Sequence, residues 1–417
     1  MIYLKNATYL DWKTSKQKKG HLAVEPGEGG KTRFVAKIPP GQKAADCSGL
    51  LVTKSFAIGH HHIYSALARG MGAPKQTPKN FIEILKYVWW NLDKKLDRDM
   101  IGAAALAAAV EAAKCGATFI IDHHASPSAI SGSLHIIAQA FESVGLSHLL
   151  CYELTDRDGA KRAQQGLDET EAYLQKRPGL VGLHASFTVG DELLKRSVAL
   201  AERHKTGLHV HAAEDKADQA YSLRTHKKRV LERFLRAGVL DSPKTILAHG
   251  LHLSAGERAI FKKSRAWLVQ NPESNQNNNV GLFDPKGLGD RIFLGTDGMH
   301  SDMIQSAKAA YLGAQAAGGI SPLGAYRRLR RVHEYLAENE FPGDGENNLV
   351  LLEYPAPTPI RPDNWPGHFM YALSRAHVRS TISNGRFIVR DGKVLTVNEN
   401  NILEYARKQA VRLWRKL

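Results

Sequence analysis

Histidines and carboxylates recur in this sequence directly after short apolar segments. There are 19 histidines in 417 residues, and histidine is the commonest metal ligand in proteins. If His60-His61-His62 lies on a strand, the first and third imidazoles point the same way and can reach one ion. With His211 and Asp297 they offer three nitrogens and one oxygen, a set that suits zinc or iron and leaves a position for water. We therefore expect one divalent metal per chain, zinc in the first place and iron as the alternative.

The middle of the chain must position these residues, and there short apolar runs alternate with helical patterns. The runs are 56–58, 117–121, 148–152, 180–183, 206–210, 244–248, 266–269 and 291–294. Eight strand–helix units over about 290 residues are typical of a TIM barrel. A doubly wound open sheet is the alternative, although no glycine-rich dinucleotide fingerprint follows the first run.

A TIM barrel carries its active site at the carboxyl ends of the strands. Nearly every predicted strand delivers an ionisable or metal-binding side chain there: His60, His62, Asp122, His123, Glu153, His184, His209, His211, His249 and Asp297. Burying such groups costs a few kcal/mol each unless they find partners. A single strand histidine is ordinarily a satisfied core residue, but the whole ordered set favours a metal centre.

Composition and charge exclude several classes of protein. Hydrophobic residues make up 43% and charged residues 24% of the chain, as in ordinary globular enzymes. The net charge of +16 raises the question of nucleic acid, but the basic residues are spread and no nucleic-acid motif is present, so we expect no such partner. Three separated cysteines, no signal-peptide pattern and no long apolar stretch predict a cytoplasmic protein without a membrane partner.

The motifs, in this order, resemble the amidohydrolase superfamily, in its branch of mononuclear deaminases and chlorohydrolases, and most closely its SsnA-type aminohydrolases. The matching stretches are 60–62, 65–70, 89–93, 122–127, 151–159, 183–188, 209–215, 271–275, 295–298, 301–303 and 354–359. The resemblance covers nearly the whole chain. It implies an α/β fold, a (β/α)8 TIM barrel at 56–345 with a small β-sandwich domain built from 1–55 and 346–417, the latter including a C-terminal helix.

The resemblance also implies roles for individual residues. It keeps the metal ligands and places Glu214 and His249 at the family's proton-handling positions. In the hypothesis that follows, Asp297 accepts a proton from a metal-bound water, which becomes the attacking hydroxide, and later passes that proton to leaving ammonia, while His249 stabilises the developing oxyanion. Glu214 protonates the ring nitrogen beside the attacked carbon. The alternatives are that Glu214 only orients a histidine and that His249 is structural.

Five further residues lie where loops could reach a substrate: His184, Arg69, Asp156, Arg157 and Ser301. A structural ion pair is the alternative for the two arginines. Trp89 and Trp90 could stack on a planar ring, but aromatic pairs in helices more often belong to the core.

The expected function is that of a metal-dependent aminohydrolase, which hydrolyses C–N bonds other than peptide bonds in a purine-like amino-substituted heterocycle. Ring opening of a cyclic amide and displacement of chloride are alternatives for the same site. A metal-dependent binding protein without catalysis is the alternative from another class. The resemblance further favours a homo-oligomer, a dimer in the first place.

Overall fold

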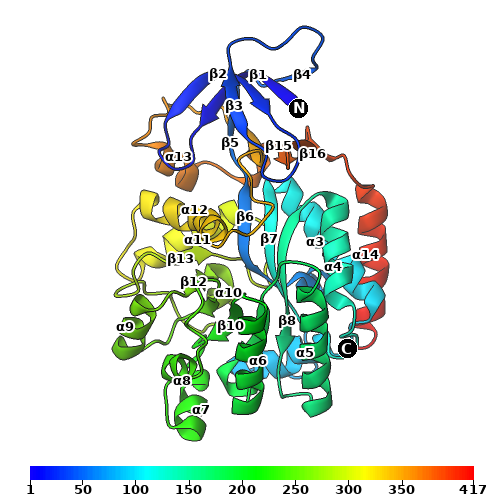
Figure 1. The fold of residues 1–417 in the computed structure, drawn as a ribbon, viewed down its shortest axis with the longest axis vertical. Helices are drawn as coiled ribbons and strands as arrows, with labels where there is room; N and C mark the ends of the chain where they lie inside the picture. The colour runs from blue at the N-terminus through cyan, green and yellow to red at the C-terminus, as the bar shows by residue number, and fades with distance from the viewer.

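The computed structural model describes all residues, 1–417, and builds them into two sheets with surrounding helices (Figure 1). Eight neighbouring strands are parallel and follow one another in chain order. They are β6 (Phe56–His61), β7 (Ala117–His124), β8 (Ser147–Leu154), β9 (Val181–Ala185), β10 (Leu208–Ala212), β11 (Ile246–His249), β12 (Trp267–Gln270) and β13 (Ile292–Leu294). All eight predicted strands are therefore confirmed.

Backbone hydrogen bonds next to the predicted metal ligands connect the last strand of the barrel to the first. Thr296 and Asp297 donate their amide N–H groups to the carbonyl oxygen of His60, over 2.9 and 3.1 Å. Gly295 permits this approach, because a Cβ there would lie only 2.8 Å from the Cβ of His60. The predicted TIM-barrel architecture is thus confirmed.

Helices follow most barrel strands and surround the barrel (Figure 1). The longer ones are α3 (Arg98–Lys114), α4 (Ser133–Val144), α5 (Ala160–Leu174), α6 (Asp191–Arg203), α7 (Lys216–His226), α8 (Val230–Arg236), α9 (Ala255–Lys263), α11 (Met303–Gln315) and α12 (Pro322–Glu338). The shorter ones are η1 (Ile63–Ala68), α1 (Phe81–Ile84), η2 (Leu85–Trp89), α2 (Trp90–Asp93), η3 (Ser186–Thr188), α10 (Pro272–Asn277), α13 (Trp365–Tyr371) and η4 (Arg375–His377).

The barrel interior is apolar except near the metal ligands. Phe119, Trp267 and Phe293 belong to one buried cluster that also includes Tyr335 of α12. The Tyr335 ring lies 5.7 Å from that of Trp267 and 5.4 Å from that of Phe293. The predicted metal ligands lie at the carboxyl ends of barrel strands.

The second sheet combines both ends of the chain and stands above the barrel in Figure 1. Its strands are β1 (Ile2–Leu10), β2 (Gln17–Val24), β3 (Thr32–Val35), β4 (Ala44–Asp46), β5 (Leu50–Lys54), β14 (Leu349–Glu353), β15 (Val378–Ser383), β16 (Arg386–Arg390) and β17 (Lys393–Val394). The C-terminal helix α14 (Glu399–Trp414) runs beside the barrel helix α3, and Trp414 donates from Nε1 to the carbonyl of Leu67 in η1 over 2.8 Å. The domain boundaries themselves stay a prediction.

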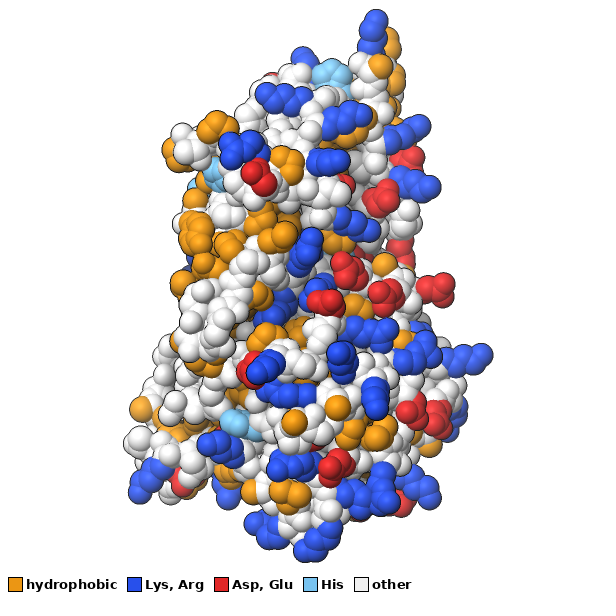
Figure 2. Space-filling model, turned by 90° about the vertical axis from the view of Figure 1, so that its left-hand side faces the viewer, with side chains coloured by type: hydrophobic (Ala, Val, Ile, Leu, Met, Phe, Trp, Pro, Cys, Tyr) orange, Lys and Arg blue, Asp and Glu red, His pale blue; other side chains and the backbone are white.

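The basic side chains form no single patch on the face of the molecule that Figure 2 shows. Figure 2 shows Lys and Arg side chains spread over one face among acidic and apolar ones. None of the helices is both long and apolar enough to cross a bilayer.

Candidate metal centre and active-site pocket

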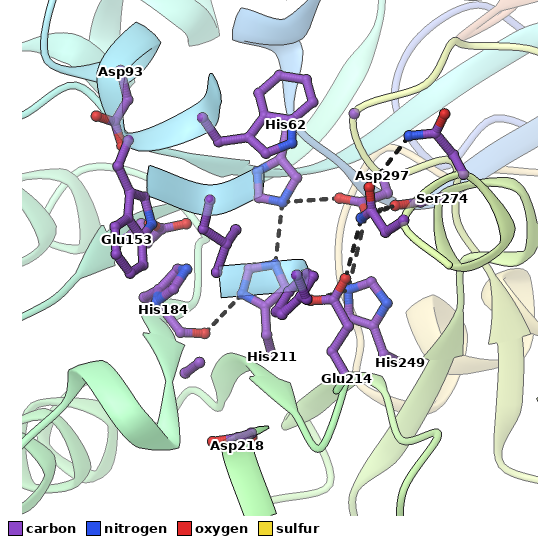
Figure 3. A pocket seen from close by; sticks show the side chains of 18 of the residues that line it. His62, Asp93, Glu153, His184, His211, Glu214, Asp218, His249, Ser274 and Asp297 are labelled. Atoms are coloured by element: carbon purple, nitrogen blue, oxygen red, sulfur yellow. Dashed lines mark hydrogen bonds and ion pairs between the residues drawn. The ribbon is translucent and has the colours of Figure 1, made fainter. Parts of the chain in front are cut away.

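The four predicted metal ligands converge at the carboxyl ends of β6, β10 and β13 (Figure 3). One donor atom from each of His60, His62, His211 and Asp297 lies within 4.8 Å of the others. Asp297 Oδ1 is 3.1 Å from His62 Nε2 and 3.4 Å from His60 Nε2. The Nε2 atoms of His62 and His211 are 3.1 Å apart.

Backbone carbonyls fix how two of these imidazoles face the centre. His62 Nδ1 lies 2.6 Å from the carbonyl oxygen of His123, and His211 Nδ1 lies 2.7 Å from that of His184. Because a carbonyl oxygen only accepts, each Nδ1 donates and each Nε2 can turn a lone pair toward the centre. Two lone pairs facing each other at this distance repel, and a cation between them would remove the conflict.

The electrostatics of the four residues also call for a positive charge. Burial lowers the pKa of His60 to about 3 and that of His211 well below its usual range, which leaves both imidazoles neutral. Burial alone would lower the pKa of His62 too, but the Asp297 carboxylate outweighs it and raises that pKa to about 9. A proton or a metal ion must therefore balance Asp297, and three histidines with one carboxylate fit a divalent metal.

Two site residues adopt a backbone conformation that L-residues rarely take. His249 has φ +74° and Asp297 has φ +53°, each at a cost of about 1–3 kcal/mol. His249 ends β11 and Asp297 follows β13 by three residues, and each is followed by a glycine. The side chain of Asp297 is held in addition by Ser274, whose hydroxyl donates to Oδ2.

His249 and Glu214 lie beside the metal centre as a pair. His249 Nδ1 is 2.7 Å from Asn275 Oδ1, an acceptor, so Nδ1 donates. Its Nε2 lies 3.5 Å from Glu214 Oε2 and 3.9 Å from Asp297 Oδ2. Burial raises the pKa of Glu214 to about 7, with Asp297 adding to the effect and His249 opposing it. A carboxyl group with this pKa can give or take a proton near neutrality.

These groups open into a pocket lined by 21 residues. Apolar walls come from Tyr64, Phe81, Leu85, Trp89, Trp90, Phe187 and Met299. His184 also lines the pocket, as predicted. Trp89 and Trp90 lie at the junction of η2 and α2, where they are half-buried and face this space.

The other four predicted substrate contacts do not line the pocket, and their part in substrate binding stays a prediction. Arg69 is paired with Glu111 over 2.7 Å, and the Asp156 carboxylate accepts from the amide of Gly190 over 2.7 Å.

Ser301 and Arg157 are likewise occupied elsewhere. The Ser301 hydroxyl lies 3.2 Å from His61 Nε2, and Arg157 lies behind the wall in an ion pair with Asp93. All four side chains thus contact other groups of the same chain. The position of a residue in a loop does not reveal such contacts from the sequence.

The structure adds four residues that the sequence reasoning did not assign to the site. Ser274 and Asn275 hold Asp297 and His249, and both fall in the matched stretch 271–275, which was the available signal. Asp93 and Asp218 line the pocket from α2 and α7; Asp93 ends the matched stretch 89–93, whereas Asp218 lies outside every matched stretch.

Comparison with known proteins agrees with this architecture. A 5-methylthioadenosine/S-adenosylhomocysteine deaminase of Desulforudis audaxviator is 26% identical over 423 residues, covering 94% of this chain and 95% of the relative. A 5'-deoxyadenosine deaminase of Methanothermobacter thermautotrophicus is 25% identical and covers 88% of both chains. The crystal structure of a zinc-bound adenosine deaminase from Xanthomonas campestris has the same fold, with a TM-score of 0.82, 17% identity and coverage of 100% and 99%. The profile of the Amidohydrolase family matches residues 59–328, more than half of the sequence, and the chain belongs to the amidohydrolase family.

Proposed function

We propose that this protein is a metal-dependent aminohydrolase that removes ammonia from an amino-substituted, purine-type heterocycle. The observation that carries the proposal is the convergence of His60, His62, His211 and Asp297 beside the Glu214–His249 pair, next to one pocket. The names of the relatives favour adenosine derivatives as the substrate class.

The proposed metal ligands are these three histidines and Asp297, and the metal is zinc. When bound, a divalent metal would lower the pKa of a water molecule enough to supply a nucleophile at neutral pH. Neutral imidazoles with fixed Nε2 lone pairs and one nearby carboxylate suit zinc, and ferrous iron stays the alternative.

The chain's own side chains then handle protons and charge. Asp297 Oδ2 lies 3.9 Å from His249 Nε2, so the two share the space where a proton must leave the attacking water. His249 stabilises the negative charge that develops on the substrate. Glu214, protonated below about pH 7, donates to the ring nitrogen beside the attacked carbon. Asp297 accepts a proton from the attacking water and passes it to the departing amine, and the proton of the added hydroxyl returns to Glu214 as the C–N bond breaks.

The walls of the pocket orient the ring and exclude water. Trp90 and Phe187 lie 6.5 Å apart and border the same space as His184. Flat apolar walls of this kind suit a planar heterocycle, since aromatic rings bury a large area at little entropic cost. A dimeric state and a cytoplasmic location stay predictions.

The test is ammonia release from a panel of adenosine derivatives, purine bases and pyrimidines. Metal-stripped protein is compared with protein reloaded with one zinc per chain. Metal-dependent ammonia from one substrate class supports the proposal. If protein with one metal per chain releases no ammonia from any compound, deamination is rejected and ring opening becomes the next reaction to assay.

A further inference from the structure

The pocket has an electrostatic character opposite to that of the whole protein. The chain carries a net charge of +16, yet none of the residues that line the pocket is lysine or arginine. Five lining residues have carboxyl groups: Asp93, Glu153, Glu214, Asp218 and Asp297. The proposed reaction uses only Glu214 and Asp297, and Asp218 Oδ2 accepts the backbone N–H of Ala213 over 2.9 Å. Glu153 and Asp93 therefore need another explanation.

Glu153 is a buried carboxylate with unused acceptor capacity. It lies near the end of β8 and is 4% exposed. Its oxygens are 3.3 Å from His123 Nδ1 and 3.9 Å from Arg157 Nη2, so only the His123 contact is short enough for a hydrogen bond. A carboxylate has about four lone-pair positions, so Glu153 can still accept from a ligand in the pocket.

The charge state of Glu153 agrees with this acceptor role. Burial would raise the pKa of its carboxyl, but His184, His123 and Arg157 outweigh burial and lower the pKa well below its usual range. The group is therefore an anion at neutral pH and only accepts hydrogen bonds.

The positive charge of the Arg157 guanidinium is already balanced by neighbouring carboxylates. Its Nη2 pairs with Asp93, its Nε lies 3.2 Å from Asp158 Oδ2, and its guanidinium lies 5.2 Å from the centre of the Trp90 ring. No cation of this wall thus remains to balance an anionic substrate.

We propose that Glu153 determines substrate specificity by accepting a hydrogen bond from an N–H or O–H group of the substrate, and that this wall excludes anionic substrates. Figure 3 shows Glu153 and Glu214 on opposite sides of the His62–His211 pair, so the donor lies on the part of the substrate remote from Glu214. The inference rests on the proposed deamination and narrows its substrate class. The substrate is an uncharged amino-heterocycle with a second donor group, carried by the ring or by an attached sugar.

The experiment compares matched substrates in the wild type, Glu153→Gln and the control Asp158→Asn. One pair is 5'-deoxyadenosine and its analogue without sugar hydroxyls. The other is 2,6-diaminopurine and adenine. The control removes a different carboxylate from Arg157 without changing a residue that lines the pocket.

The expected result is a preference for the donor-bearing member of one pair, by about ten- to a hundredfold in kcat/KM. A preference within the first pair indicates a donor on the sugar, and a preference within the second pair indicates a donor on the ring. Glu153→Gln should remove most of this preference, and Asp158→Asn should keep it. Adenosine 5'-monophosphate should react at least about a hundredfold more slowly than adenosine, because its phosphate finds no cation.

Several outcomes would overturn the assignment. They are the absence of a preference in both wild-type pairs, an unchanged preference in Glu153→Gln, and equal turnover of the monophosphate and the nucleoside. Failure of Glu153→Gln to fold leaves the wild-type comparisons decisive. Ammonia from none of the compounds would defeat the proposed reaction instead, and calorimetric binding of the same pairs would then test Glu153 by itself.

Discussion

Ser274 offers a sharp test of the metal centre because it touches only one proposed ligand. Its hydroxyl donates to Asp297 Oδ2, while Oδ1 of the same carboxylate faces His60 and His62. Ser274→Ala removes this donor from a carboxylate that is 8% exposed. A hydrogen bond to a charged group is worth about 1.5–3 kcal/mol. If nearly all of this energy holds Asp297 in its ligating orientation, metal affinity should fall by about ten- to a hundredfold.

The assay is competition for zinc between the protein and a chromophoric chelator, with ammonia release as a second readout. Ser306→Ala is the matched control, since Ser306 donates to Glu273 Oε2 over 2.6 Å but contacts none of the proposed ligands. Ser306→Ala should keep the affinity of the wild type. Equal zinc affinity in Ser274→Ala and Ser306→Ala, both folded, would refute the reasoning that Ser274 positions a ligand.

Three further predictions concern the proton donor, the fold and the metal. Glu214→Gln should keep the metal but lower kcat at least about a hundredfold. In the wild type, kcat/KM should fall as pH rises through about 7, because the acid form of Glu214 is lost. Both effects are read from ammonia release against pH, and an unchanged alkaline limb in the variant would contradict the assignment. The Asp344 carboxylate is buried between Lys54 and His333, 2.8 Å from each. Asp344→Asn should lower the free energy of unfolding by about 3–5 kcal/mol. Asp391 forms an exposed ion pair with Arg379, and Asp391→Asn should lower the free energy of unfolding by less than about 1 kcal/mol. Urea unfolding measures both, and similar losses would contradict a buried ion pair. His333 and Lys54 outweigh burial and lower the pKa of Asp344, so its contribution to stability should be present above about pH 4 and vanish as pH falls through the lowered pKa. Finally, stripping the metal should lower the unfolding free energy by about 2.7 kcal/mol relative to protein with free zinc at a hundredfold excess over Kd. A melting temperature unaffected by chelator would exclude a tightly bound metal.

Local sequence patterns predicted most of the catalytic half of the fold. Each barrel strand is a short apolar run flanked by helical periodicity, and that signal needs no knowledge of the rest of the chain. The same locality made His60 and His62 readable as a pair, because alternate strand residues share a face. The second sheet was predicted only in part. In β1 and β5 buried and exposed positions do not alternate regularly, so a local period-two pattern does not identify them.

Only the tertiary structure decided how loop side chains point and which partners support the site. The left-handed backbone of His249 and Asp297 leaves no mark in composition, since glycine would be the residue expected there. Arg69 and Ser301 follow the carboxyl ends of barrel strands in the sequence. Their side chains nevertheless contact Glu111 and His61 and do not line the pocket. The sequence could thus predict which residue types arrive at the rim, because strand periodicity is local. The direction of each side chain beyond the rim depends on partners distant in the chain, which only folding brings together.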